Sequence, residues 1–249
     1  MDETYTTKTI ILDSQPFREF DTKVILYSND KGKLELVARG TKKLLSKIAG
    51  HIEPISLSQV MVVRGKKFNY IASSISQNCY FNIKNDLEKL EYVGRAISLF
   101  NKLIKENDQT DAEFFFILLK EYLNIINNNK STVINYELFY NIFILKLLVL
   151  LGYKPELYSC IICKKSLKLG KNYFNISQGG VVCAKCKKDN NTLTISENCI
   201  KVLRLVIQED FKRLIKIKIK SQLARELCGI ISSFLKYNFE IGGSYGDKR

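Results

Sequence analysis

Apolar and polar residues alternate through the first eighty residues, in short runs separated by turn-forming residues. Runs of this period are typical of β-strands that bury one face. The pattern predicts strands at residues 8–13, 22–27, 33–38, 54–63 and 68–81. Because no long helix interrupts them, we expect a small closed barrel of the OB type. An SH3-like barrel would give much the same pattern.

From residue 86 onwards the apolar residues recur every three or four positions, which is typical of amphipathic helices. Helices are predicted at residues 86–105 and 133–151, and the second is apolar nearly all round, as a buried central helix would be. Between them, Thr110 and Glu113 form a capping box before a further apolar stripe. Two later helices are expected to begin at serine caps. These caps are Ser196 and Ser221.

Four cysteines interrupt the helical part in two pairs, each with two residues between its members. They are Cys160, Cys163, Cys183 and Cys186. This spacing predicts one tetrahedral Zn²⁺ site built from two knuckles, and four thiolates leave no position for a reactive water. The zinc is therefore expected to be structural. Two disulfides, or thiols that happen to lie close together, are the alternatives, but the order of the pairs argues against them.

The chain is accordingly predicted to be an α+β protein, with an N-terminal OB-fold barrel followed by an α-helical domain that carries an inserted four-cysteine zinc ribbon. A hairpin between the cysteine pairs completes the ribbon. The predicted divisions are 1–82 for the barrel, 83–158 and 190–240 for the helical domain, 159–189 for the ribbon and 241–249 for a flexible tail.

The charge of the chain points to an anionic partner. Its formal net charge is +14, and such an excess favours nucleic acid or an acidic protein tail. The first basic cluster lies in a stretch without acidic residues, where a loop can follow a phosphate backbone. The DNA-contacting residues that we expect are Arg39, Lys42, Lys43 and Lys47, with Arg64, Lys66 and Lys67 on a second turn and Arg18 on the first connection. A solvated basic loop is the alternative.

A third basic cluster alternates with isoleucines, so that one side is apolar and the other cationic. It suits either further DNA or an acidic tail that ends in an apolar residue. Its members are Lys212, Arg213, Lys216, Lys218 and Lys220.

Signs of an enzyme, an export signal or a membrane span are weak. The single histidine, His51, has no nucleophile motif to serve, and no phosphate-binding loop of the ATPase type occurs. The start of the chain is polar, and its longest apolar run is too short to cross a bilayer. An odd number of cysteines fits a reducing compartment, so a cytoplasmic protein without catalytic activity is expected.

Several segments resemble the bacterial recombination mediator RecO family in the same order along the chain. The N-terminal segments are 11–21, 32–43, 52–54 and 64–65. The later ones are 150–157 before the first cysteine pair and 174–180 before the second. This resemblance covers nearly the whole chain, to about residue 239.

The resemblance implies a non-enzymatic protein of the RecF recombination pathway that binds single- and double-stranded DNA and anneals complementary strands. With RecR, it would help to load RecA onto strands coated by single-strand-binding protein. In that family the acidic C-terminal tail of the single-strand-binding protein docks on the helical domain. Two other interpretations of the barrel, ribbon and charge stay open: a zinc-ribbon RNA-binding or ribosome-associated factor, and a scaffold for acidic proteins.

Overall fold

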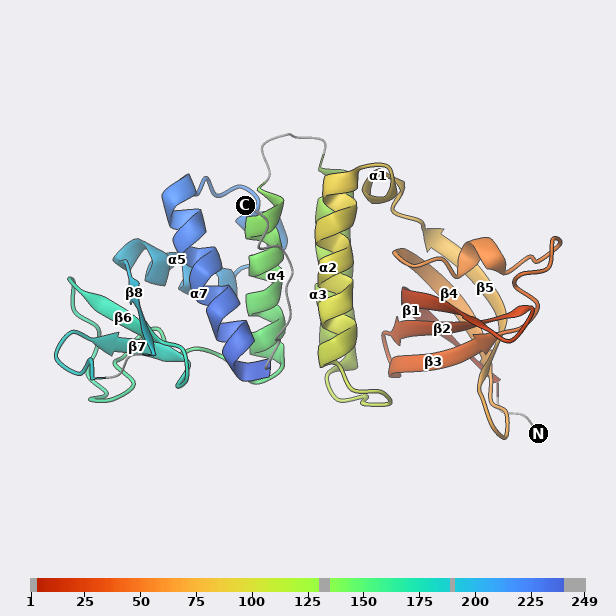
Figure 1. The fold of residues 1–249 in the computed structure, drawn as a ribbon, viewed down its shortest axis with the longest axis horizontal. Coiled ribbons are helices and arrows are strands. Elements are labelled where there is room, and N and C mark those ends of the chain that lie inside the picture. Colours follow the sequence, from red (N-terminus) through yellow and green to blue (C-terminus); the bar gives the residue numbers. More distant parts are fainter. Residues whose placement is uncertain (1–3, 130–134, 189–190, 240–249) are drawn as a thin grey trace. The chain divides into compact units, whose positions relative to one another are not determined.

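The computed structural model describes residues 4–129, 135–188 and 191–239. The chain forms two compact units, residues 1–130 and 131–249. Strands come first and helices follow, as predicted for an α+β protein (Figure 1). The unit boundary separates the first predicted helices from the later ones, and the predicted domain divisions remain predictions.

Five strands of the first unit form a closed barrel in the order β1-β2-β3-β5-β4. They are β1 (Thr4–Phe17), β2 (Asp21–Ser28), β3 (Gly32–Ala38), β4 (Ser56–Val63) and β5 (Tyr70–Asn78). β1 pairs antiparallel with both β2 and β4, whereas a short parallel contact between β3 and β5 closes the ring. All five predicted strands are confirmed.

β1 can pair on both sides because it bends. The register of β1 against β2 shifts between Ile11 and Asp13. An extra residue on one strand of an antiparallel pair bends that strand and increases its twist. The bend allows one 14-residue strand to pair first with β4 and then with β2.

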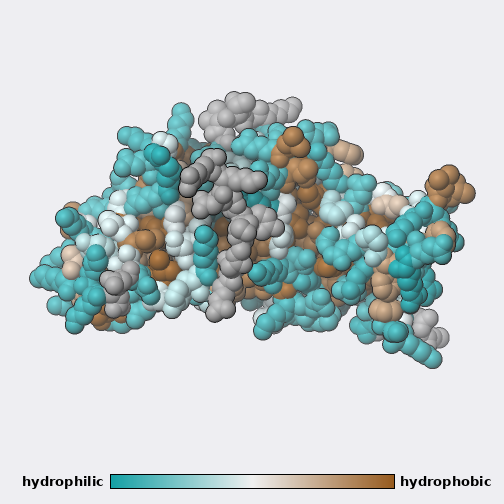
Figure 2. Space-filling view, viewed as in Figure 1, coloured by the Kyte–Doolittle hydropathy of each residue, from teal (hydrophilic) through white to brown (hydrophobic). Residues whose placement is uncertain are grey.

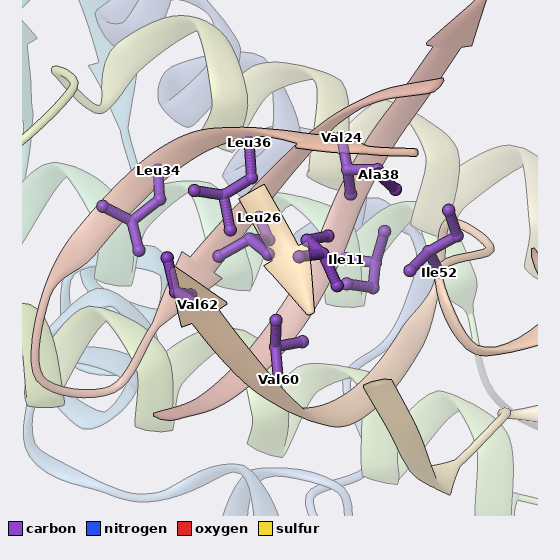
Figure 3. Packing of buried hydrophobic residues seen from close by; sticks show 10 residues of the cluster. Ile11, Val24, Leu26, Leu34, Leu36, Ala38, Ile52, Val60 and Val62 are labelled. Carbon is purple, nitrogen blue, oxygen red and sulfur yellow. The ribbon is translucent and has the colours of Figure 1, made fainter. Parts of the chain in front are cut away.

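The barrel interior is filled by aliphatic side chains from alternate strand positions. Figure 3 shows these side chains pointing toward one another. The cluster consists of Ile11, Val24, Leu26, Leu34, Leu36, Ala38, Ile52, Val60, Val62 and Ile71. Burying one aliphatic side chain of this size contributes roughly 1.5–3 kcal/mol, so the alternating pattern supplies the barrel's main stabilisation.

The described residues of the first unit also form three α-helices: α1 (Phe81–Lys84), α2 (Leu87–Leu103) and α3 (Ala112–Asn128). α2 and α3 lie side by side (Figure 1). The Asp86 side chain caps α2 by accepting hydrogen bonds from the N–H groups of Glu88 and Lys89. The buried Lys33 of β3 donates to the carbonyl oxygens of Asn101 and Ile104 at the end of α2, at 2.6 and 3.4 Å.

The predicted capping box of Thr110 and Glu113 is wrong. α3 begins at Ala112, its cap residue is Asp111 with φ of 55°, and no side chain caps it. The Asp108 carboxylate accepts the Thr110 N–H at 2.9 Å, which holds Thr110 in the preceding turn. Glu113 is consequently the second helical residue, where it cannot complete the box.

The second unit contains four helices within its described residues: α4 (Tyr136–Leu150), α5 (Glu197–Gln208), α6 (Phe211–Leu214) and α7 (Ser221–Phe239). α4 confirms the predicted central helix, although residues 130–134 lie outside the described part. Ser196 caps α5 by accepting the Cys199 N–H, as predicted. Ser221 is the first residue of α7 rather than a residue before it.

The chain between α4 and α5 forms a small antiparallel sheet. Its order is β7-β6-β8, with β6 (Asn172–Asn175), β7 (Gly180–Cys183) and β8 (Thr192–Ile195). The predicted hairpin corresponds to β6 and β7, and β8 is a third strand that the sequence pattern did not reveal. Among the described residues, no helix is both long and apolar enough to cross a membrane. The predicted tail at 241–249 lies outside the described residues.

Candidate metal centre and nucleic-acid interface

The first cysteine pair lies on a tight knuckle. The Cys160 N–H donates to the Lys165 carbonyl oxygen, and the Lys164 N–H donates back to the Cys160 carbonyl oxygen, both at 2.9 Å. Lys164 has φ of 59°, which reverses the chain directly after Cys163. The Ile161 N–H donates to the Val181 carbonyl oxygen at 3.0 Å, so the knuckle is fastened to β7.

The second pair begins at the end of β7. The Cys186 N–H donates to the Cys183 carbonyl oxygen at 3.0 Å, and the Cys183 N–H donates to the Cys160 sulfur at 3.5 Å. The sulfur atoms of Cys160, Cys163, Cys183 and Cys186 all lie within 4.8 Å of one another. Four sulfurs this close form a set that could hold one metal ion, as the spacing predicted.

The thiol pKa values show why a cation suits this cluster. Burial opposes the charged form of Cys160, but backbone N–H groups of Cys163, Cys183 and Ile162 outweigh it and lower the pKa to about 6. At Cys186, the hydrogen bond with Cys183 together with the other sulfurs raises the pKa to about 12. A further negative charge in the cluster is unfavourable unless a cation balances it.

The other two buried cysteines behave differently. Burial raises the pKa of Cys199 and of Cys228 to about 12. Neither belongs to a described group of potential metal ligands. They pack as small apolar side chains.

A cationic surface surrounds the cysteine cluster, and the sequence reasoning did not single it out. Seven lysines and no acidic residue occur between Cys160 and Lys188. They are Lys164, Lys165, Lys168, Lys171, Lys185, Lys187 and Lys188, all of them exposed. Four thiolates around a divalent cation carry net negative charge, so nearby lysines stabilise them by attraction.

A second basic surface forms where the β1–β2 connection meets the loop after β3. The Lys42 ammonium donates to the Arg18 carbonyl oxygen at 3.2 Å, and the Lys42 N–H donates to the Phe20 carbonyl oxygen at 3.1 Å. The Asp21 carboxylate accepts the Gly40 N–H at 2.9 Å. These bonds hold two sequence-distant basic segments together.

Aromatic rings lie under the cations of this surface. The Arg39 guanidinium is 3.8 Å from the centre of the Tyr70 ring. Arg18 lies over Phe17 at 5.2 Å and near Phe68 at 5.9 Å. Such contacts orient cations without neutralising them.

Lys67 lies 5.7 Å from the Phe68 ring centre, and Lys43 lies 5.8 Å from that of Phe20. We refer to the grouped cations as the cationic face. It comprises Arg18, Arg39, Lys42, Lys43 and Lys67.

Three of the predicted DNA-contacting residues do not belong to the cationic face. Arg64 lies over Tyr5 of β1, 5.9 Å from its ring centre, and Lys66 is exposed in the β4–β5 turn. That turn requires Gly65, since a Cβ there would lie 2.5 Å from the Phe68 carbonyl oxygen. Lys47 is exposed on the loop after β3.

Phe68 and Tyr70 supply two of the rings beside the cations of the cationic face. Both side chains are half-buried. Phe68 lies before the first residue of β5, where strand alternation does not apply, and its ring packs edge-on against Phe17 at 5.5 Å. The alternating pattern therefore concealed two aromatic partners of the cationic face.

His51 anchors the loop after β3. Its Nδ1 accepts the Ser76 N–H at 3.2 Å, and its carbonyl oxygen accepts hydrogen bonds from the Ser58 and Ser74 hydroxyls at 3.0 and 2.9 Å. It lies in the short 3-10 helix η1 (Ala49–His51). These contacts show that His51 fastens the loop to β4 and β5.

The third basic cluster lies on α6 and the segment that follows it. Its isoleucines, at 215, 217 and 219, are half-buried, and its basic side chains are exposed, as the alternation predicted. Arg213 forms an ion pair with Glu209 at 2.7 Å, and this hydrogen-bonded pairing raises the Arg213 pKa. Arg213 is therefore less available to an external anion than its lysine neighbours.

These features define a class of protein: a small β-barrel with a cationic face, joined to helices that carry a four-cysteine module. Comparison with known families makes the class specific. Residues 1–78 match the model of recombination protein O N terminal, and residues 84–243 match that of recombination protein O C terminal.

Curated relatives agree over almost the full length. The DNA repair protein RecO of Thermoanaerobacter sp. is 29% identical over 236 residues, which cover 94% of this chain and 92% of the relative. That of Dehalococcoides mccartyi is 30% identical over 236 residues, covering 95% and 91%. The chain belongs to the RecO family.

Proposed function

We propose that this protein acts in DNA repair by binding single- and double-stranded DNA and annealing complementary strands. Its curated relatives carry the name DNA repair protein RecO. The observation that carries the proposal is the cationic face on the barrel of a RecO-family chain. The alternative as an RNA-binding or ribosome-associated factor has no such support.

The cationic face suits contact with a phosphate backbone. Its arginine and lysine side chains are exposed, and aromatic rings below them restrict their positions. Salt-dependent, sequence-independent binding is the expected behaviour of such a surface. Lys47, Arg64 and Lys66 extend it in this proposal.

Annealing needs no catalytic group. Two complementary strands repel each other through their phosphates, and cations bound to both reduce that repulsion. Half-buried aromatic rings beside the cations also offer surfaces for bases to stack upon. We accordingly propose a non-enzymatic, nucleotide-independent activity.

The family relationship supports two protein partners in this proposal. RecR would cooperate in loading RecA onto coated strands, within the RecF recombination pathway. The acidic C-terminal tail of the single-strand-binding protein would contact Lys212, Lys216, Lys218 and Lys220, whose exposed ammonium groups flank half-buried isoleucines. Arg213 would contribute less because of its ion pair with Glu209.

The four sulfurs would hold one structural Zn²⁺. Thiolate ligands at this spacing favour zinc, and a complete set of four cysteines supplies folding energy rather than chemistry. We also assign the five-stranded barrel to the OB type and the protein to the cytoplasm, where reduced thiols persist and DNA is repaired.

A strand-annealing assay tests this function directly. Two complementary labelled oligonucleotides, bare or coated with single-strand-binding protein, are mixed without nucleotide, and annealing is followed by energy transfer at low and high salt. Acceleration that fades with salt is expected. No acceleration at either salt concentration would contradict the proposal.

A further inference from the structure

The loop after β3 carries two leucines in open solvent. Leu44 and Leu45 have relative exposures of 103% and 89%, the highest among the large apolar side chains that the structure describes as exposed. Figure 2 shows apolar atoms that protrude from hydrophilic surroundings beside the barrel, at the place where the tip of this loop lies in Figure 1. Packing within the described part of the chain does not account for these side chains.

Local geometry does not require leucine at either position. The Ser46 N–H donates to the Lys43 carbonyl oxygen at 3.0 Å, so residues 43–46 form a β-turn with both leucines at its central positions. Glycine, proline, asparagine, aspartate and serine usually occupy such positions. We refer to residues 43–46 as the leucine turn.

The loop after β3 is anchored to the barrel on both sides of the leucine turn, so the turn projects from a fixed base. The Thr41 hydroxyl is hydrogen-bonded to that of Thr22 at 2.6 Å. On the other side, Ile48 packs against the barrel core and Ile52 lies within it. An anchored loop holds its tip in one place at a lower entropic cost than a free loop.

Cations surround the leucines. Lys42, Lys43 and Lys47 are exposed, and Lys43 and Lys42 belong to the cationic face. A partner for this tip must therefore present anionic and apolar groups close together. A single DNA strand does so at every nucleotide, because each base lies beside a phosphate.

We propose that the leucine turn is a wedge that inserts between adjacent bases of a single strand while the lysines hold the flanking phosphates. Apolar side chains are known to enter base steps and unstack them. The inference rests on the proposed DNA-binding function and adds a specific contact to it. The wedge would separate neighbouring bases and leave their pairing edges exposed to a second strand.

The test compares the full-length wild type with the double variant Leu44→Ser/Leu45→Ser, since serine suits both turn positions. Leu169→Ser is the matched control, because Leu169 is 84% exposed but lies in the second unit. One probe is a single strand with 2-aminopurine at a central step, and the other is an abasic strand of equal length.

The wild type should raise 2-aminopurine fluorescence, which reports unstacking. The double variant should lose that rise and bind the normal strand about tenfold more weakly, as expected for one lost base contact. It should bind the abasic strand as the wild type does, with an unchanged salt slope, because no charge is removed. Leu169→Ser should match the wild type on both probes.

An unchanged fluorescence rise in the double variant would overturn the wedge and leave the proposed function standing. Equal losses on normal and abasic strands would also overturn it, since they would indicate a changed loop. Loss of binding to anionic phospholipid vesicles, with DNA binding intact, would assign the turn to lipid instead. Failure of the wild type to bind either strand would overturn both the wedge and the proposed function.

Discussion

The barrel and the cysteine module are both small β structures, but different forces hold them together. Ten apolar side chains fill the barrel interior. The strands of the module, β6, β7 and β8, have four residues each, and their buried apolar side chains are Phe174, Val181, Val182 and Ile195. Burial builds the barrel, whereas four convergent sulfurs organise the module, so the two should fail under different treatments.

The largest expected effect comes from removing one sulfur. Structural zinc contributes an apparent free energy of about 10–16 kcal/mol to small domains, so Cys163→Ser should release the metal and unfold the module. Metal content by mass spectrometry and thermal unfolding measure this. Cys79→Ser is the control, because Cys79 is half-buried and lies outside the cluster. A Cys163→Ser protein with wild-type metal content and melting would contradict the metal site.

A cavity in the barrel should have a smaller, separate effect. Leu26 is fully buried in the barrel, and Leu26→Ala should lower the free energy of unfolding by about 2–5 kcal/mol. Urea unfolding measures this loss, and metal content should stay unchanged. Leu87→Ala, at a site that is 87% exposed, is the control. Metal loss in Leu26→Ala would show that the two regions are not independent.

Removing equal numbers of positive charges from the barrel loop and from the cysteine module compares their contributions to DNA binding. Replacing Lys42, Lys43 and Lys47 by glutamine removes three charges from the barrel loop. Each lost phosphate contact lowers the salt slope for single strands by roughly 0.7, so a decrease of about 2 is expected. Fluorescence anisotropy over a salt series measures the slope.

The control for that variant removes three charges from the cysteine module, with glutamine at Lys164, Lys165 and Lys168. If those lysines mainly offset thiolate charge, the salt slope should change little. Equal decreases in the two triple variants would show that the module contacts DNA as strongly as the barrel loop does.

The smallest predicted effect concerns the junction between β8 and α5. Ser196 caps α5 and its side chain also donates to Glu226 at 2.8 Å. Ser196→Ala should lower the free energy of unfolding by about 1 kcal/mol without metal loss. Thermal unfolding measures it, with the exposed Ser166→Ala as control. A destabilisation as large as that of Cys163→Ser would mean that the junction, rather than the sulfurs, holds the module.

The barrel strands and the sulfur cluster were both predictable from the sequence. Alternation identified all five barrel strands, because a half-buried strand must place apolar residues on one face. The spacing of the cysteine pairs predicted the sulfur cluster, because only a tight turn brings two ligands to one ion. Both features depend on local order along the chain.

Features that depend on contacts between distant segments were missed. β8 has only four residues and pairs with β6 across the second cysteine pair, so no local pattern marks it. The pairing of Arg39 with Tyr70 arises from the parallel contact of β3 with β5. The capping box failed for a local reason, because the Asp108 carboxylate holds Thr110 in the turn before the helix.

Hydrogen exchange of the intact protein, with and without a single-stranded oligonucleotide, tests the central claim most directly. If the cationic face and the leucine turn bind DNA, the strand should slow exchange in residues 18–20, 39–48 and 64–69, with little change between residues 160 and 188. Slowed exchange confined to residues 160–188, with the barrel loops unchanged, would contradict the account.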